Sequence, residues 1–103
     1  MGIHIRKIVM DVLKPHEPDI AEMAKEIAKN IGIEGVNISV YEIDKSVENV
    51  KITIEGEFEN YTRIGETIKR CGGTIHSIDE VIVGSKVVSE RETLHDRQEM
   101  HPG

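Results

Sequence analysis

The feature that most constrains the fold is a succession of helical and strand-like segments that occurs twice along the 103-residue chain. In each half, a segment with helical spacing ends at glycine and an alternating apolar segment follows it. The two junctions read IGIEGVNI from Ile31 and CGGTIHSI from Cys71. Strict alternation is typical of strands, and apolar residues every three or four positions are typical of helices. The chain therefore predicts the order strand, helix, strand, strand, helix, strand.

Two segments carry the helical spacing. The clearer one covers residues 19–31, with Gly32 as the left-handed stop and either Asp19 as the N-cap or Glu17 as the cap before a helix that begins at Pro18. The second covers residues 60–71, with Asn60 as the expected cap. We expect the first helix to bury one apolar stripe, formed by Ile20, Met23, Ala24, Ile27, Ala28 and Ile31.

Four segments alternate in the manner of strands, at residues 3–13, 36–44, 50–57 and 74–83. The first is apolar on both faces, which predicts a central strand. We expect it to break at residues 14–18, because two prolines there cannot continue a central strand. The second and third strands are expected to form a hairpin.

Right-handed crossovers interleave these two halves into an α+β, ferredoxin-like βαββαβ sandwich. The predicted sheet is antiparallel and four-stranded, with order 4-1-3-2, and both helices cover one face. Residues 1–88 make up this domain. Residues 89–103 are polar and mixed in charge, and we expect them to be a mobile or partner-dependent tail.

Composition excludes several classes of protein. The chain has 13 Lys and Arg against 19 Asp and Glu, a formal net charge of −6, so we expect no nucleic-acid partner. No apolar run reaches the length of a membrane span and no signal peptide is visible, so we expect no membrane partner. Cys71 is the single cysteine, which favours a reducing cytoplasm and core packing of this thiol.

The face of the sheet opposite the helices is expected to be too apolar to remain fully solvated. It places Val9, Leu13, Tyr41 and Ile43 beside polar residues. The two edge strands, 36–44 and 74–83, contain no proline and alternate well, so they can pair with other chains. We expect a homo-oligomer, either a ring through the edge strands or a face-to-face dimer.

One rim of the sheet gathers the candidate site residues. We expect a ligand-binding set there, consisting of Asp11, His16, Glu17 and His76. Asp11, Asp44 and His76 form the candidate metal set, because carboxylates and imidazole together suit a divalent cation. The alternative interpretation is that Asp11 pairs locally and His76 is a half-buried side chain with satisfied hydrogen bonds.

A weaker candidate site combines a carboxylate of the third strand with one from the fourth. Glu55 is expected to lie across the sheet from Asp79 or Glu80. Because Asp79 and Glu80 are adjacent in sequence, alternation predicts that they point to opposite faces and that only one joins Glu55. The alternative is a solubilising charged edge.

Four separated segments resemble one known family. They are IHSIDEV at 75–81 after the glycine pair 72–73, LKPHEP at 13–18, VYEID at 40–44 and TIEG at 53–56. Together they are similar to the archaeal family catalogued as domain of unknown function 211, over residues 3–95. The resemblance implies a ferredoxin-like domain, a cytoplasmic archaeal source and oligomers, and it implies no established activity. The fold is more loosely similar to ACT-type regulatory domains, which pair their sheets and bind amino acids or metals at interfaces.

The leading hypothesis is a self-assembling ligand- or metal-binding or regulatory module without catalytic activity. Its ligand is unidentified, with a divalent cation as the candidate. One alternative is a small enzyme that uses the rim carboxylates and His76 as acid and base. A second alternative is a purely structural oligomeric protein.

Overall fold

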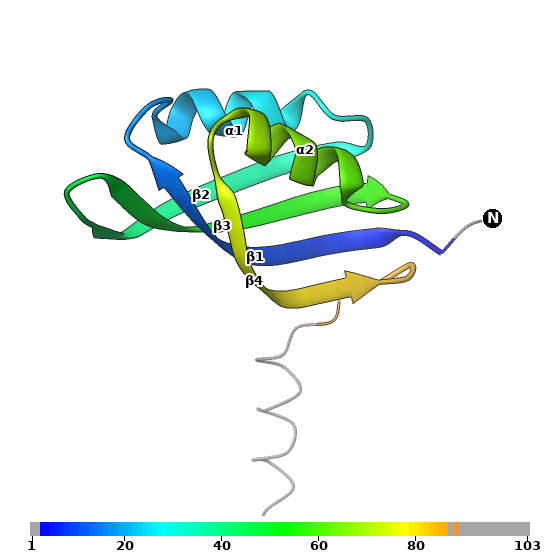
Figure 1. Ribbon diagram of the computed structural model, residues 1–103. Coiled ribbons are helices and arrows are strands. Elements are labelled where there is room, and N and C mark those ends of the chain that lie inside the picture. The colour runs from blue at the N-terminus through cyan, green and yellow to red at the C-terminus, as the bar shows by residue number, and fades with distance from the viewer. Residues whose placement is uncertain (1–2, 87, 89–103) are drawn as a thin grey trace, which may run out of the picture.

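The computed structural model describes residues 3–86 and 88, and the predicted tail at 89–103 lies outside them. The elements are β1 (Ile5–Pro15), α1 (Ile20–Ala28), β2 (Ile33–Ile43), β3 (Val47–Phe58), α2 (Thr62–Arg70) and β4 (Thr74–Val83). The strands pair antiparallel in the order β2-β3-β1-β4, which is the predicted order. Both helices lie on one face of the curved sheet, and none of the described elements covers the other face, which we call the uncovered face (Figure 1). Neither described helix is long and apolar enough to span a membrane.

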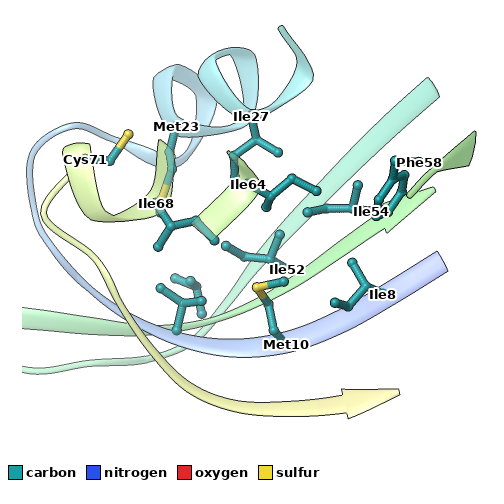
Figure 2. Packing of buried hydrophobic residues seen from close by; sticks show 12 residues of the cluster. Ile8, Met10, Met23, Ile27, Ile52, Ile54, Phe58, Ile64, Ile68 and Cys71 are labelled. Atoms are coloured by element: carbon teal, nitrogen blue, oxygen red, sulfur yellow. The ribbon is translucent and has the colours of Figure 1, made fainter. Parts of the chain in front are cut away.

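The core fills the layer between the helices and the sheet (Figure 2). Alternate residues of β1 and β3 point into it, as their alternation predicts. The fully or nearly buried members are Ile8, Met10, Val12, Met23, Ile27, Val50, Ile52, Ile54, Phe58, Ile64, Ile68 and Cys71. The lone thiol therefore packs in the core, as predicted, and burial raises its pKa.

The predicted boundaries differ from the structure by up to three residues in every element except β4, and two of these differences have a structural cause. The helix α1 ends at Ala28, and the side chain of Ile31 is 83% exposed instead of completing the buried stripe. The strand β1 does not break before its proline but continues through Pro15, which pairs with Val47. Pairing with β4 reaches only to Leu13, so Pro15 occupies an edge position, where a proline is tolerated.

A close approach of two backbones explains why α1 ends early. Gly32 adopts a positive φ of 89°, and its carbonyl accepts a hydrogen bond of 2.8 Å from the Glu57 amide. A Cβ atom on Gly32 would overlap the Glu57 carbonyl, and a Cβ atom on Gly56 would overlap the Gly32 carbonyl. The start of β2 can therefore meet the end of β3 only if both positions are glycine.

We predict that Gly56→Ala destabilises the domain by about 3 kcal/mol, the upper end of the range for overpacking. The added methyl group must displace backbone atoms of the Gly32 segment. Gly35→Ala is the matched control, because nothing lies within 4 Å of a Cβ atom there. Urea denaturation of both variants measures the difference, and equal midpoints would refute the close-approach explanation.

Candidate functional site

Asp11 lies on the uncovered face of the sheet, between Lys51 on β3 and Ser77 on β4. The Ser77 hydroxyl lies 2.9 Å from Asp79 Oδ1 and 3.4 Å from Asp11 Oδ2. Its single proton favours the shorter contact, so Asp11 receives at most a weak hydrogen bond. The other oxygen, Asp11 Oδ1, is buried and has no hydrogen-bond partner among the described residues. Such an unsatisfied buried oxygen carries a desolvation cost.

A shallow depression surrounds this carboxylate. It has a volume of about 440 Å³ and is lined by Asp11, Ser39, Tyr41 and Lys51. The Lys51 ammonium lies 3.7 Å from Asp79 Oδ2, so Asp79 is its ion-pair partner. The depression therefore combines a poorly satisfied carboxylate, a hydroxyl, an exposed aromatic ring and the ammonium group of Lys51, which is paired with Asp79. We call these four residues and Ser77 the Asp11 site.

Two irregularities in β4 bring more charge to this face than alternation predicts. The pairing of β1 with β4 shifts between Val9 and Met10 and again between Asp11 and Val12. As a consequence, the side chains of Asp79 and Glu80 both contact lysines on the uncovered face, one from β3 and one from β1. Asp79 pairs with Lys51, and Glu80 pairs with Lys7 at 3.1 Å.

The prediction that Asp79 and Glu80 point to opposite faces is therefore wrong, because a bulge resets the alternation between neighbours. Glu55 is in register with Lys7 across the β1–β3 pair, and Lys7 forms the ion pair with Glu80, so the expected partnership of Glu55 with one of these carboxylates stays a prediction.

The predicted metal set is not assembled within one chain. Among residues 3–86 and 88, no three side chains of His, Cys, Asp or Glu are grouped so that they could hold a metal ion. His76 is exposed at one irregularity of β4. Asp44 follows β2 at the opposite margin of the sheet, where its side chain accepts a hydrogen bond of 2.8 Å from the Lys45 amide. A cation at Asp11 would thus need ligands from Asp79, Ser77 or a second chain.

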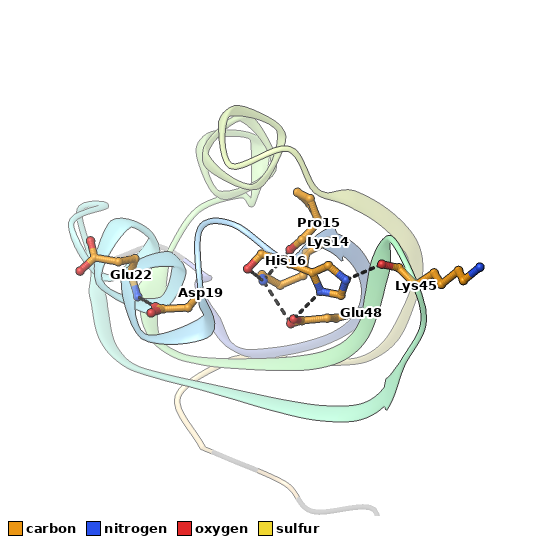
Figure 3. Close-up of polar contacts among 7 residues, drawn as sticks. All are labelled: Lys14, Pro15, His16, Asp19, Glu22, Lys45 and Glu48. Atoms are coloured by element: carbon orange, nitrogen blue, oxygen red, sulfur yellow. Dashed lines mark hydrogen bonds and ion pairs between the residues drawn. The ribbon is translucent and has the colours of Figure 1, made fainter.

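His16 takes part in a different arrangement, drawn in Figure 3. Its Nδ1 lies 3.0 Å from Glu48 Oε2, and its Nε2 lies 2.8 Å from the Lys45 carbonyl. Lys14 Nζ lies 3.2 Å from Glu48 Oε1 and donates to the Pro15 carbonyl at 2.7 Å. We call Lys14, His16 and Glu48 the Lys14 cluster. It joins the end of β1 to the turn between β2 and β3.

Charge explains the geometry of the Lys14 cluster. The Lys14 side chain is completely buried, and a buried ammonium requires a paired anion. Both ring nitrogens of His16 face acceptors, an arrangement that only the doubly protonated ring satisfies. The hydrogen bond to Glu48 raises the pKa of His16, and the same hydrogen bond, followed by the one to Lys14, lowers the pKa of Glu48.

The predicted ligand-binding set therefore divides. Asp11 belongs to the uncovered face, His16 belongs to the Lys14 cluster, and Glu17 is an exposed residue of the β1–α1 loop. Lys14 and Glu48 were not predicted to be partners, because a lysine at the end of a strand and a glutamate near a polar turn are typical of solvated surfaces. The signal that could have found them is the inward position of Lys14 in the alternation of β1, two residues after Val12.

The chain matches the family described as uncharacterized ArCR, DUF211, over residues 6–97. It belongs to this archaeal family. It is also 56% identical over 93 residues to the uncharacterized protein MJ0319 of Methanocaldococcus jannaschii, an alignment that covers 90% of this chain and 96% of that protein. The family resemblance drawn from the four sequence segments is thus confirmed. In this DUF211 domain, the Asp11 site is the candidate for a functional role. The Lys14 cluster is the candidate for a role in stability.

We predict that the Lys14 cluster stabilises the domain most between about pH 4.5 and 6.5, the ordinary pKa values of Glu48 and His16. The raised pKa of His16 gives stability that is complete below 6.5 and is lost as pH rises through the folded-state value. The lowered pKa of Glu48 gives stability that is lost as pH falls below 4.5. The measurement is the urea midpoint of His16→Gln relative to wild type across this range.

The matched control for that measurement is His76→Gln, which replaces an exposed histidine outside the cluster. The His16→Gln deficit should shrink above pH 6.5, whereas a deficit that grows with rising pH would contradict the assignment of His16 as an imidazolium.

Proposed function

We propose that this DUF211 domain is a self-associating binding module whose uncovered sheet face receives a cationic group at Asp11. The observation that carries the proposal is the buried Asp11 Oδ1, which lacks a hydrogen-bond partner within the described residues. Asp11 also lines the depression, so a cationic ligand there can contact the accessible side of the carboxylate and neutralise the negative charge that both oxygens share. A divalent cation or an ammonium group fits this requirement.

Apolar exposure supports the self-associating part of the proposal. Large apolar side chains are solvent-exposed along both margins of the sheet, on β2 at Tyr41 and Ile43 and on β4 at Ile78, Val81 and Val83. Apolar groups gathered at unpaired strand edges favour association with a further chain. A second copy can also bring ligands to a cation at Asp11, where the described residues of one chain group fewer than three His, Cys, Asp or Glu side chains.

The arrangement gives no comparable support to catalysis. A general acid and base need to converge on one reacting atom. His16 is already engaged with Glu48 and Lys45, and the remaining rim residues are separated, as described above. The module is therefore proposed as a binding protein, with Asp11 as the residue that determines ligand charge.

Self-association is tested by sedimentation velocity over a wide range of protein concentration. We expect a species larger than the monomer, and we expect Ile78→Lys or Ile43→Lys to shift it toward monomer by placing charge at an exposed apolar edge position. Lys25→Gln, on the exposed surface of α1, is the control and should leave the distribution unchanged. A wild-type protein that stays monomeric at high concentration would contradict the proposal.

Cation binding is tested by titrating the wild-type protein with Ca²⁺, Mg²⁺, Mn²⁺, Ni²⁺ and Zn²⁺ in a calorimeter. We expect at least one cation to bind, and we expect Asp11→Asn to weaken it about tenfold or more, because a charged ligand is replaced by a neutral one. Asp44→Asn is the matched control at the other margin of the sheet. Equal affinities of wild type and Asp11→Asn would show that Asp11 is not the ligand.

A further inference from the structure

A second concave site lies at the other end of the domain from the Lys14 cluster. It is a cavity of about 460 Å³ between the end of α1, the start of β2, the end of β3 and the start of α2. This volume falls within the range of sites that hold small organic ligands. The cavity shares no lining residue with the Asp11 site. The inference drawn from it is independent of the proposed function.

Four of the ten residues that line the cavity are apolar, namely Ile31, Ile33, Phe58 and Ile64. Phe58 and Ile64 are buried in its floor and belong to the main core, and Ile33 is half-buried beside them. At its mouth stands Ile31, whose side chain is 83% exposed. A large aliphatic side chain that is solvated at the edge of an apolar cavity gains free energy when a ligand covers it, in proportion to the apolar area removed from water.

The wall that carries Ile31 is fixed before any ligand arrives. The Gly32 carbonyl accepts the hydrogen bond from Glu57, and the close approach of Gly32 to Gly56 leaves no room for adjustment. The backbone that carries Ile31 and Ile33 is therefore held next to the end of β3 by the Gly32–Glu57 hydrogen bond and by the pairing of Ile33 with Gly56. Preorganisation of this kind reduces the entropy lost on binding.

One cation is available at the cavity. Arg63 lies in the first turn of α2 and lines the cavity, and its guanidinium forms no ion pair or hydrogen bond among the described residues. The first turn of α2 contains no acidic residue. Glu57, by contrast, is already paired with Arg6 at 3.2 Å. The group that is free to bind a ligand's charge is thus a planar guanidinium, whose geometry matches a carboxylate.

From these contacts we infer that the cavity binds a small carboxylate with a branched aliphatic chain. The carboxylate pairs with Arg63, and the aliphatic chain lies on Phe58 and Ile33 and covers Ile31. Two sources share this chemistry, a simple branched fatty acid and an aliphatic amino acid. Glu59, another lining residue, forms no ion pair within the described residues. Its negative charge attracts the ammonium group of an amino acid, which a fatty acid lacks, so it favours binding of the amino acid.

The test is a titration of the full-length ¹⁵N-labelled protein, monitored by the amide chemical shifts of the cavity residues. The probes are 4-methylpentanoate, leucine, acetate and inorganic phosphate. We expect saturable shifts at residues 31, 58 and 64 with 4-methylpentanoate or leucine, and the tighter of the two identifies the source. Absence of shifts with both, or acetate or phosphate binding equally well, would overturn the inference.

Two variants separate the roles of charge and apolar surface. Arg63→Gln should weaken binding of the preferred probe about tenfold or more, whereas Lys69→Gln removes an exposed positive charge from the last turn of the same helix and should have no effect. Ile31→Ser should reduce the preference for the branched chain over acetate without unfolding the protein, because Ile31 is solvated. Unchanged affinity in Arg63→Gln would overturn the assignment of the carboxylate contact.

Discussion

Packing of both helices against a single face of the sheet is the constraint on which the rest of this structure depends. The aliphatic side chains of β1 and β3 that point toward α1 and α2 are buried completely, and their burial provides the main driving force for folding. Because the described residues form no second layer on the other face, side chains there pair only with neighbours on the sheet itself, as Lys51 does with Asp79 and Lys7 with Glu80. Asp11 at the centre of this face has one buried oxygen without a hydrogen-bond partner among the described residues.

Two local devices hold the ends of the strands in place around this core. At one end, the buried ammonium of Lys14 is neutralised by Glu48, which in turn binds His16. At the other end, Gly32 and Gly56 allow two backbones to meet where any side chain would overlap. The first device depends on charge and pH, and the second depends only on sterics. Each of them also shapes a neighbouring surface, the rim loop in the first case and the wall of the Arg63 cavity in the second.

The sequence predicted the structure correctly where the periodic spacing of apolar residues determines which side chains are buried. The alternation in β1 and β3 correctly predicted which residues are buried, and the two junctions at glycine correctly predicted the order of elements and hence the sheet order. It failed where tertiary contacts override local pattern. Ile31 continues the helical spacing of α1, yet the approach of Gly32 to β3 ends that helix at Ala28.

The candidate site was harder to predict for the same reason. The bulges of β4 contain no glycine or proline that would predict them from the sequence. Alternation alone therefore could not show on which face of the sheet Asp79 lies. Likewise, the pairing of Lys14 with Glu48 joins residues 34 positions apart, a separation over which single-sequence patterns carry no information about contact. Asp11 and His16 were assigned to one ligand set at the rim of the sheet, yet Asp11 lies on the uncovered face and the ring of His16 is engaged in the Lys14 cluster.

The claim that the uncovered face is occupied in solution is tested most directly by hydroxyl-radical footprinting of the two tyrosines. In a single chain, Tyr41 on the uncovered face is 57% exposed and Tyr61 beside α2 is 40% exposed. If another copy covers the face around Asp11, Tyr41 is oxidised more slowly than Tyr61 at high protein concentration, and dilution reverses that order. Oxidation of Tyr41 that remains faster than that of Tyr61 at every concentration would contradict this account.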